Sequence, residues 1–195
     1  MTLLHPTYFG PVGWYAAVAK GQAAVDGGDR YRRQTERNRC LIATANGVQQ
    51  LTVPVTPPSR RPGECPTRDV RISDHGNWRH QHWQALQSAY GMSPFFDYYA
   101  DDLRPLFERR HEWLYDLDME TAYTVSRLLD IPATDLRETD TARRESSPAV
   151  QCDTLPQCQG EYYQTFRRRH GFIPNLSILD LLCNEGPAGI LYLRK

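Results

Sequence analysis

The stretch that decides the fold is RNRCLIATANGVQQLTVPV, residues 37–55. Two β-rich runs flank Asn46-Gly47, a dipeptide that is typical of a two-residue hairpin turn. The sequence therefore predicts a β-hairpin with this turn. Its predicted register pairs three positions across the turn: Cys40 with Val53, Ile42 with Leu51, and Asn38 with Val55.

Alternation along the first strand places Asn38 on the apolar face of the hairpin. Arg37 and Arg39 are predicted to project from the opposite face. An unsatisfied buried amide costs about 1–3 kcal/mol, so Asn38 must be held by hydrogen bonds. Asn38 is therefore a structured, informative position.

Upstream of the hairpin, the pattern predicts a strand, a turn, a helix and a second strand. The segment LLHPTYFGPVGWYAAVAKG, residues 3–21, contains a short apolar run, a turn rich in Pro and Gly, and a helix that Gly21 ends. QAAVD, residues 22–26, follows as a short strand. Because this order is typical of a parallel βαβ unit, we expect an α/β fold. The expected architecture is a single domain with a Rossmann-like mixed sheet, the β-hairpin and several flanking helices.

Downstream, RDVRIS (residues 68–73) predicts another short strand, and several helices follow. Pro105 should interrupt one of them, and Asp118 is the predicted N-cap of a helix over residues 119–130. Residues 137–160 are polar and lack periodicity, which predicts a surface loop or a partly disordered segment within one domain spanning residues 1–195.

Composition excludes some classes of partner. The 195 residues include 23 Lys and Arg against 23 Asp and Glu, so net charge does not favour nucleic acid. No apolar run approaches the roughly 20 residues of a membrane span, and the first residues do not resemble a signal peptide. Five cysteines without such a signal favour reduced thiols in the cytoplasm. Cys152 and Cys158 have no second pair at a zinc-like spacing, so no metal site is predicted.

The segment SDHGNWRHQHW, residues 73–83, begins the longest predicted helical region. Helical spacing puts Trp78 and His82 on one stripe, whereas His80 faces elsewhere. In one interpretation Trp78 walls a polar pocket, Arg79 binds an anion and His82 acts as an acid or a base. In the other, this is an aromatic core helix and His82 is a buried, hydrogen-bonded histidine.

Two further segments supply candidate site residues. His5 lies where the first strand meets the helix, a place where ligands bind in open α/β sheets, although it can equally be a turn residue. In PNLSILDLLCNEGP (residues 174–187), Ser177 and Asp180 match a capping box, which competes with a catalytic role for Asp180. Asn175 precedes the cap and is a candidate pocket residue.

Common cofactor and nucleophile motifs are missing from the sequence. It contains no G-x-G-x-x-G, no P-loop and no G-x-S-x-G, so no cofactor is identified. Cys40 is interpreted as a small buried hydrophobe rather than a nucleophile.

The chain resembles the WbqC-like protein family, most closely its short Bacteroidetes-type members. Broader members begin with Gln-Pro where this chain has His5-Pro6, and they have a Gly-rich motif where this chain has QCQGEYYQ. The resemblance rests on four segments: HPTYFGPVGWY, YRRQTERNRC, DHGNWRHQHWQALQSAYGMSPFFDYY and GFIPNLSILDLLCNEGP.

The resemblance implies a cytoplasmic protein associated with O-antigen and other surface polysaccharides, with acyl or aminoacyl transfer to an amino sugar as the hypothesis for its chemistry. The family motifs coincide with seven candidate residues: Asn38, Arg39, Trp78, His82, Asn175, Ser177 and Asp180.

The leading hypothesis is an enzyme acting on a nucleotide- or lipid-linked amino sugar. His82 is its predicted general base, Arg39 and Arg79 bind phosphate or carboxylate, and Asn38 and Asn175 position polar groups. The first alternative is a nucleotidyl-transfer enzyme that uses His5. The second is a non-catalytic protein that binds sugar or assists assembly.

Overall fold

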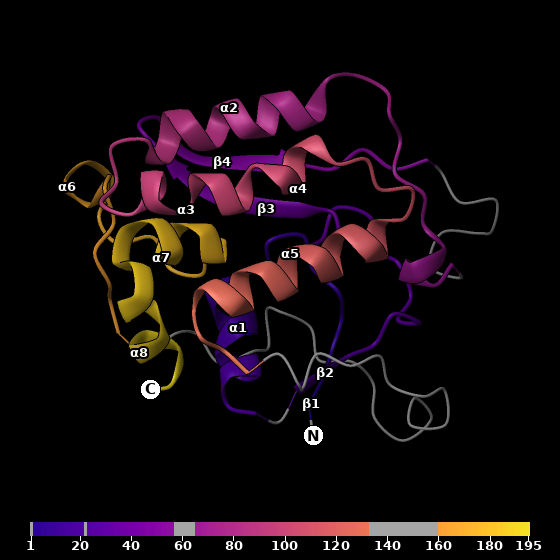
Figure 1. Cartoon of the computed structure of the whole chain (residues 1–195), viewed down its shortest axis with the longest axis horizontal. Coiled ribbons are helices and arrows are strands. Elements are labelled where there is room, and N and C mark those ends of the chain that lie inside the picture. Colours follow the sequence, from indigo (N-terminus) through magenta and orange to yellow (C-terminus); the bar gives the residue numbers. More distant parts are fainter. Residues whose placement is uncertain (1, 22, 57–64, 133–159) are drawn as a thin grey trace.

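A computed structural model describes residues 2–21, 23–56, 65–132 and 160–195 (Figure 1). The strands are β1 (Thr2–Leu4), β2 (Ala23–Val25), β3 (Arg39–Thr44) and β4 (Gly47–Thr52). The helices are α1 (Val12–Ala19), α2 (Trp78–Tyr90), α3 (Phe96–Leu103), α4 (Pro105–Glu108), α5 (Leu114–Leu128), α6 (Arg167–His170), α7 (Ile178–Glu185) and α8 (Gly189–Leu193).

The start of the chain forms the predicted parallel βαβ unit. Leu3 of β1 pairs in parallel with Ala24 of β2, and α1 connects the two strands. Gly21, at a φ of 71°, follows α1 and donates its N–H to the carbonyl of Val18 at 2.9 Å. A left-handed glycine at a helix end is energetically inexpensive, which explains the stop.

The hairpin is present, but its predicted register is wrong by two residues. Cys40 pairs with Leu51 rather than Val53, so the turn residues are Ala45 and Asn46. The Thr44 hydroxyl closes this turn by accepting from the N–H of Asn46 at 3.2 Å and donating to the carbonyl of Gly47 at 2.8 Å. Because a shift of two preserves alternation, the predicted apolar face is still buried. It consists of Cys40, Ile42, Leu51 and Val53.

The described strands form two separate two-stranded sheets, β1–β2 and β3–β4. The fold is therefore a mixed α/β single domain, but the Rossmann-like arrangement is not confirmed. The segment RDVRIS contributes to a short 3₁₀ helix (Thr67–Asp69) followed by isolated bridges rather than a strand. The predicted polar loop over residues 137–160 lies outside the described residues, except for Gly160.

Helices α2 and α7 pack against β3, and α2 lies along the hairpin (Figure 1). Aromatic side chains fill the interior between these elements. The largest fully buried ones are Trp14, Tyr8, Tyr15, Tyr90, Tyr99 and Phe9.

Two predictions about helix ends have opposite outcomes. The break at Pro105 is confirmed, because α3 ends just before it and α4 begins there. The predicted N-cap at Asp118 is wrong, since α5 begins at Leu114 and buries Asp118 in its interior. Leu114 and Leu117 are both buried, and the N–H of Leu114 donates to the carbonyl of Val70 at 2.9 Å. Tertiary packing thus extends the helix by a turn.

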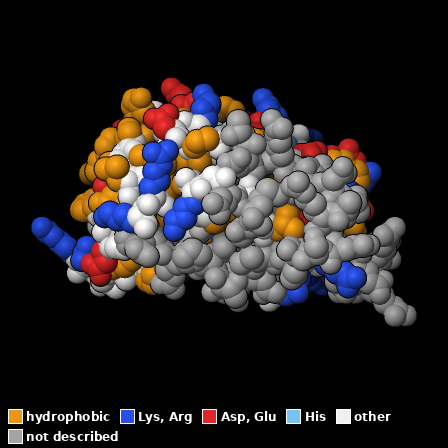
Figure 2. All heavy atoms as spheres, turned by 90° about the horizontal axis from the view of Figure 1, so that it is seen from below, with side chains coloured by type: hydrophobic (Ala, Val, Ile, Leu, Met, Phe, Trp, Pro, Cys, Tyr) orange, Lys and Arg blue, Asp and Glu red, His pale blue; other side chains and the backbone are white. Residues whose placement is uncertain are grey.

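The surface has both signs of charge. On the face seen in Figure 2, described hydrophobic side chains lie among Lys and Arg and among Asp and Glu, toward the end of the molecule with α7 and α8. This mixture agrees with the balance of 23 basic and 23 acidic residues. Within the described ranges, none of the helices has the length and hydropathy to cross a bilayer.

Candidate functional site

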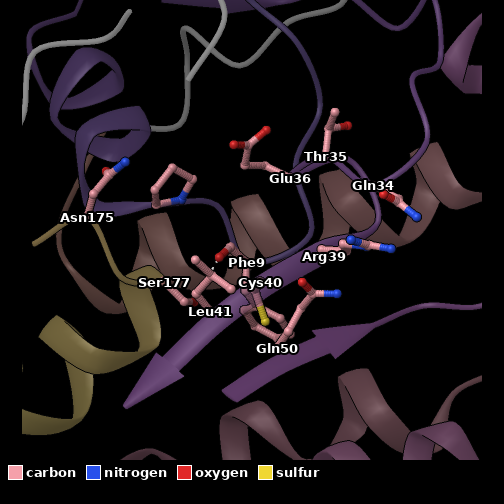
Figure 3. A pocket seen from close by; sticks show the side chains of 11 residues that line it. Phe9, Gln34, Thr35, Glu36, Arg39, Cys40, Leu41, Gln50, Asn175 and Ser177 are labelled. Atoms are coloured by element: carbon pink, nitrogen blue, oxygen red, sulfur yellow. Dashed lines mark hydrogen bonds between the residues drawn. The ribbon is translucent and has the colours of Figure 1, made fainter. Parts of the chain in front are cut away.

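A pocket of about 170 Å³ lies beside the hairpin (Figure 3). Asn175 lines it from the segment before α7, Glu36 from the loop before β3, and Arg39 and Gln50 from the two strands (Figure 3). We call this space the hairpin pocket. Its lining residues are Phe9, Pro11, Gln34, Thr35, Glu36, Arg39, Cys40, Leu41, Gln50, Asn175 and Ser177.

Backbone hydrogen bonds bring three distant parts of the chain together at this pocket. The N–H of Val12 donates to the carbonyl of Leu176 at 3.0 Å, and that of Ile178 donates to Gly10 at 2.9 Å. The N–H of Ser177 donates to the carbonyl of Leu41 on β3 at 2.8 Å. The start of α1, the hairpin and the start of α7 are therefore joined around the site.

The backbone that lines the pocket is strained. Within the described chain, the non-glycine residues with positive φ are Phe9, Gln34, Asp130 and Asn175. Phe9 (43°), Gln34 (64°) and Asn175 (56°) all line the hairpin pocket. Such conformations cost about 1–3 kcal/mol each and gather at active sites and ligand clamps. This concentration of strain favours a functional pocket.

An acidic and a basic side chain provide the charges of the pocket. Glu36, whose side chain is 41% exposed, has its Oε2 at 3.9 Å from Nε2 of the buried His5. Its carbonyl accepts from the N–H of Tyr8 at 2.9 Å, which holds the loop. On the hairpin, the amide oxygen of Gln50, with the amide turned toward Arg39, accepts from Nε at 3.2 Å and Nη1 at 3.1 Å. Glu36 and Arg39 are thus held in place by their neighbours.

Two of the lining residues, Ser177 and Cys40, have structural roles. Ser177 is the N-cap of α7, as predicted; its Oγ accepts from the N–H of Leu179 at 3.3 Å and donates to the carbonyl of Phe9 at 2.8 Å. Burial raises the pKa of the Cys40 thiol, although a hydrogen bond with Ser177 lowers it. The Cys40 thiol is therefore protonated at neutral pH, as expected of a small buried side chain.

His82 lies inside the protein, on the buried stripe of α2 with Trp78. Its Nδ1 lies 3.0 Å from the hydroxyl of Tyr8, and its ring also makes a hydrogen bond to the backbone of Thr52. Burial lowers the pKa of His82 to about 4, and the Thr52 bond raises it by a smaller amount. A neutral ring that accepts from Tyr8 and donates to Thr52 satisfies both nitrogens. His82 thereby links α2, the hairpin and the loop after β1.

Asp180 does not complete the predicted capping box. The N–H of Ser177 donates to Leu41, and Oδ2 of Asp180 instead accepts from Tyr162 Oη at 2.8 Å and Gln164 Nε2 at 3.0 Å. Burial raises the pKa of Asp180 to about 6, against the lowering effect of these hydrogen bonds and one from Tyr90. Only the Ser177 half of the box exists.

Asn38 is buried as predicted, whereas its neighbour Arg37 does not lie on the predicted outer face. Asn38 is buried, and its Nδ2 donates to the carbonyl of Val53 at 3.0 Å. Arg37 was expected on the outer face, but it is only 3% exposed and forms an ion pair with Asp29. It precedes β3, so strand alternation does not apply to it.

The structure therefore brings together some of the predicted site residues. Arg39, Asn175 and Ser177 line the hairpin pocket, and His5 lies behind Glu36. Arg79 lines a different pocket at the start of α2. The remaining predicted residues are buried and are not among the lining residues of either pocket: Asn38, Trp78, His82 and Asp180.

Sequence reasoning missed Gln34, Glu36 and Gln50 as lining residues. Gln34 and Glu36 belong to the segment YRRQTERNRC, which contributed to the family resemblance. Gln50 lies on an exposed strand position, where the sequence has no burial signal.

One of the comparisons with known proteins identifies a family. The model of the WbqC-like protein family matches residues 6–165. The protein named "Uncharacterized protein Rv1507c" from Mycobacterium tuberculosis is 28% identical to this chain, and the alignment covers 85% of this chain and 84% of that relative. No solved structure matches the chain significantly.

Proposed function

The chain belongs to the WbqC-like protein family, and we propose that it is a cytoplasmic enzyme of bacterial surface-polysaccharide biosynthesis. Its proposed substrate is the amino sugar of a nucleotide- or lipid-linked glycan precursor. The proposed reaction is acyl or aminoacyl transfer to the sugar amine.

The observation that carries this proposal is the carboxylate of Glu36 at a small pocket that polar and apolar residues line together, beside the buried imidazole of His5. A volume of about 170 Å³ suits a single sugar ring rather than a complete nucleotide sugar. Amide groups of Gln34, Gln50 and Asn175 surround it, and such groups bind sugar hydroxyls. The rest of the precursor would extend outside.

In the proposed step, the sugar amine attacks the carbonyl carbon of an activated acyl donor. A nitrogen–carbon bond forms, the bond from the acyl carbon to its leaving group breaks, and Glu36 accepts the proton that the amine loses. Transfer of that proton to the leaving group restores the carboxylate. His5 orients Glu36, and Arg39 binds a phosphate or carboxylate of the substrates.

The buried candidates are proposed as positioning residues. His82 holds Tyr8, whose N–H donates to the carbonyl of Glu36. Trp78 packs edge-on against His82, with ring centroids 5.1 Å apart. Asn38 and Asp180 fix the hairpin and α7. This assigns the general-base role to Glu36 in place of His82, because Glu36 lines the hairpin pocket whereas His82 is buried and lines neither pocket.

The test compares Glu36→Gln with Glu112→Gln, which removes an exposed carboxylate paired with Arg71. Cells that lack the gene are complemented with each variant, and mass spectrometry follows their nucleotide sugars and surface glycan. We expect Glu36→Gln to reduce the modification roughly 100-fold or more, because a positioned general base contributes about that much. Equal modification by both variants would exclude Glu36 as the base.

Binding of glucosamine, followed by ligand-observed NMR, distinguishes catalysis from recognition alone. Saturable binding by the wild-type protein, with no change in the glycan on gene deletion, would favour the non-catalytic sugar-binding alternative. The nucleotidyl-transfer alternative requires His5 to reach a phosphate. His5 is 1% exposed and lies behind Glu36, so the geometry favours the amino-sugar proposal over it.

A further inference from the structure

A second pocket, of about 330 Å³, lies at the N-terminal end of α2, beside α4. We propose that this α2 pocket binds the phosphate group of a small phosphorylated molecule. It shares no lining residue with the hairpin pocket, so the proposal is independent of the amino-sugar reaction. Its lining residues are Asp74, Gly76, Asn77, Arg79, His80, Trp83, Arg104, Phe107, Glu108 and Arg110.

Arg79 has hydrogen-bond donors that the described protein does not use. Its guanidinium stacks on Trp78, 4.5 Å from the ring centroid, and Nη1 donates to Asp74 Oδ1 at 2.8 Å. Nε and Nη2 are buried without a hydrogen-bond partner among the described residues. Unsatisfied buried donors are costly, particularly on a charged group. The stack presents Arg79 as a fixed, partly desolvated cation.

Helix α2 adds backbone donors to the same pocket. Its N-cap, Asn77, makes no side-chain capping hydrogen bond, and the first turn has no acidic residue. The first N–H groups of a helix lack intrahelical partners, and the helix dipole favours an anion there. At 13 residues α2 is long enough for this effect.

The opposite side of the pocket supplies further cations and an apolar wall. Arg104 lies just before α4 and Arg110 just after it, and Nε of Arg104 also pairs with Oε1 of Glu108 at 2.6 Å. Trp83 and Phe107 lie together, with ring centroids 5.7 Å apart. Arginine binds phosphate oxygens through several N–H groups, and the two rings can contact an attached organic group. Together these features favour a phosphate monoester.

The experiment is isothermal titration of the full-length protein in phosphate-free buffer, with inorganic phosphate and with phenyl phosphate as probes. Arg110→Gln removes a pocket arginine. Arg109→Gln is the matched control, because Arg109 is its neighbour but pairs with Glu120 and does not line the pocket. Arg79 is left intact, since its stacking on Trp78 contributes to the fold.

We expect saturable binding of both probes by the wild-type protein, tighter for phenyl phosphate. Arg110→Gln should weaken binding about tenfold, the effect of losing one charge-assisted contact, whereas Arg109→Gln should leave it unchanged. Equal affinity for the two probes would support the anion site and assign it to free phosphate. No saturable binding, or equal losses in both variants, would overturn the proposal.

Discussion

Asp118 is a carboxyl group inside α5 that has no hydrogen-bond partner for either oxygen among the described residues. Burial raises its pKa well above the ordinary value, and Arg37 lowers it by a smaller amount. A raised carboxyl pKa means that the charged form is less favourable in the folded protein than in the unfolded chain. Ionisation of Asp118 therefore costs stability.

The first prediction concerns Asp118→Asn. Below the ordinary pKa of about 4, Asp118 is protonated in both states and has no effect; as pH rises through its folded pKa, the wild type loses stability. The neutral amide avoids that loss. We expect the variant to be more stable than the wild type at pH 8 by about 1–3 kcal/mol, with the difference closing toward pH 4. Urea denaturation measures it.

The control is Asp116→Asn on the exposed side of the same helix, which should change stability little at either pH. A loss of stability at pH 8 in Asp118→Asn would contradict the prediction, because it would mean that the charged form is stabilised in the fold.

Among the elements, α7 depends on a titratable side chain for its link to the preceding segment. Asp180 accepts hydrogen bonds from Tyr162 and Gln164. The Gln164 side chain also bonds the backbone of Ile173: its Nε2 donates to the Ile173 carbonyl at 2.9 Å, and its Oε1 accepts from the Ile173 N–H at 2.9 Å. Burial raises the pKa of Asp180 to about 6. The attachment of residues 162–173 to α7 is therefore coupled to pH.

The second prediction follows for Asp180→Asn. In the wild type, stability falls as pH rises from about 4, the ordinary pKa, through about 6, the folded value. The expected contribution is about 3 kcal/mol, since one pH unit corresponds to about 1.4 kcal/mol. In the variant this loss of stability should be absent. The difference in unfolding free energy between the two proteins should therefore grow over that pH interval and be constant above pH 7.

Unfolding free energies of Asp180→Asn at several pH values measure this difference. Asp101→Asn, an exposed change on α3, is the control. A difference that does not vary between pH 4 and pH 7 would show that Asp180 has an ordinary pKa.

At the scale of the whole molecule, Ser177 joins the start of α1, the hairpin and α7. Its backbone N–H donates to β3, while its hydroxyl caps α7 and donates to Phe9. The hairpin pocket exists only where these three parts meet. Global stability and pocket geometry are thus expected to depend on the same hydroxyl group.

The third prediction is that Ser177→Ala destabilises the protein by about 1–2 kcal/mol, the usual cost of a lost N-cap. Amide hydrogen exchange should accelerate at Val12 and Ile178, whose N–H groups cross the junction. Ser88→Ala, at an exposed position of α2, is the control. Unchanged exchange at both amides would contradict a joining role for this hydroxyl.

The sequence by itself determined the local elements. Periodicity and turn residues predicted the βαβ unit, the hairpin, the break at Pro105 and the buried stripe of α2, because each depends on contacts between residues close in the chain. The predicted buried face of the hairpin is correct although the predicted register is wrong, because a shift of two residues preserves alternation. The resemblance to the WbqC-like family was also available from the sequence, and the family comparison confirms it.

Only the tertiary structure decided which polar residues share a pocket. Arg39 and Asn175 are far apart in sequence, and no periodic pattern relates them; the hydrogen bond from the N–H of Ser177 to the carbonyl of Leu41 on β3 brings them together. The extra turn of α5 and the buried position of Asp118 likewise depend on packing against Val70 and the core. Sequence patterns report the side of an element that faces inward, whereas a site forms from long-range contacts that follow only from how the elements pack.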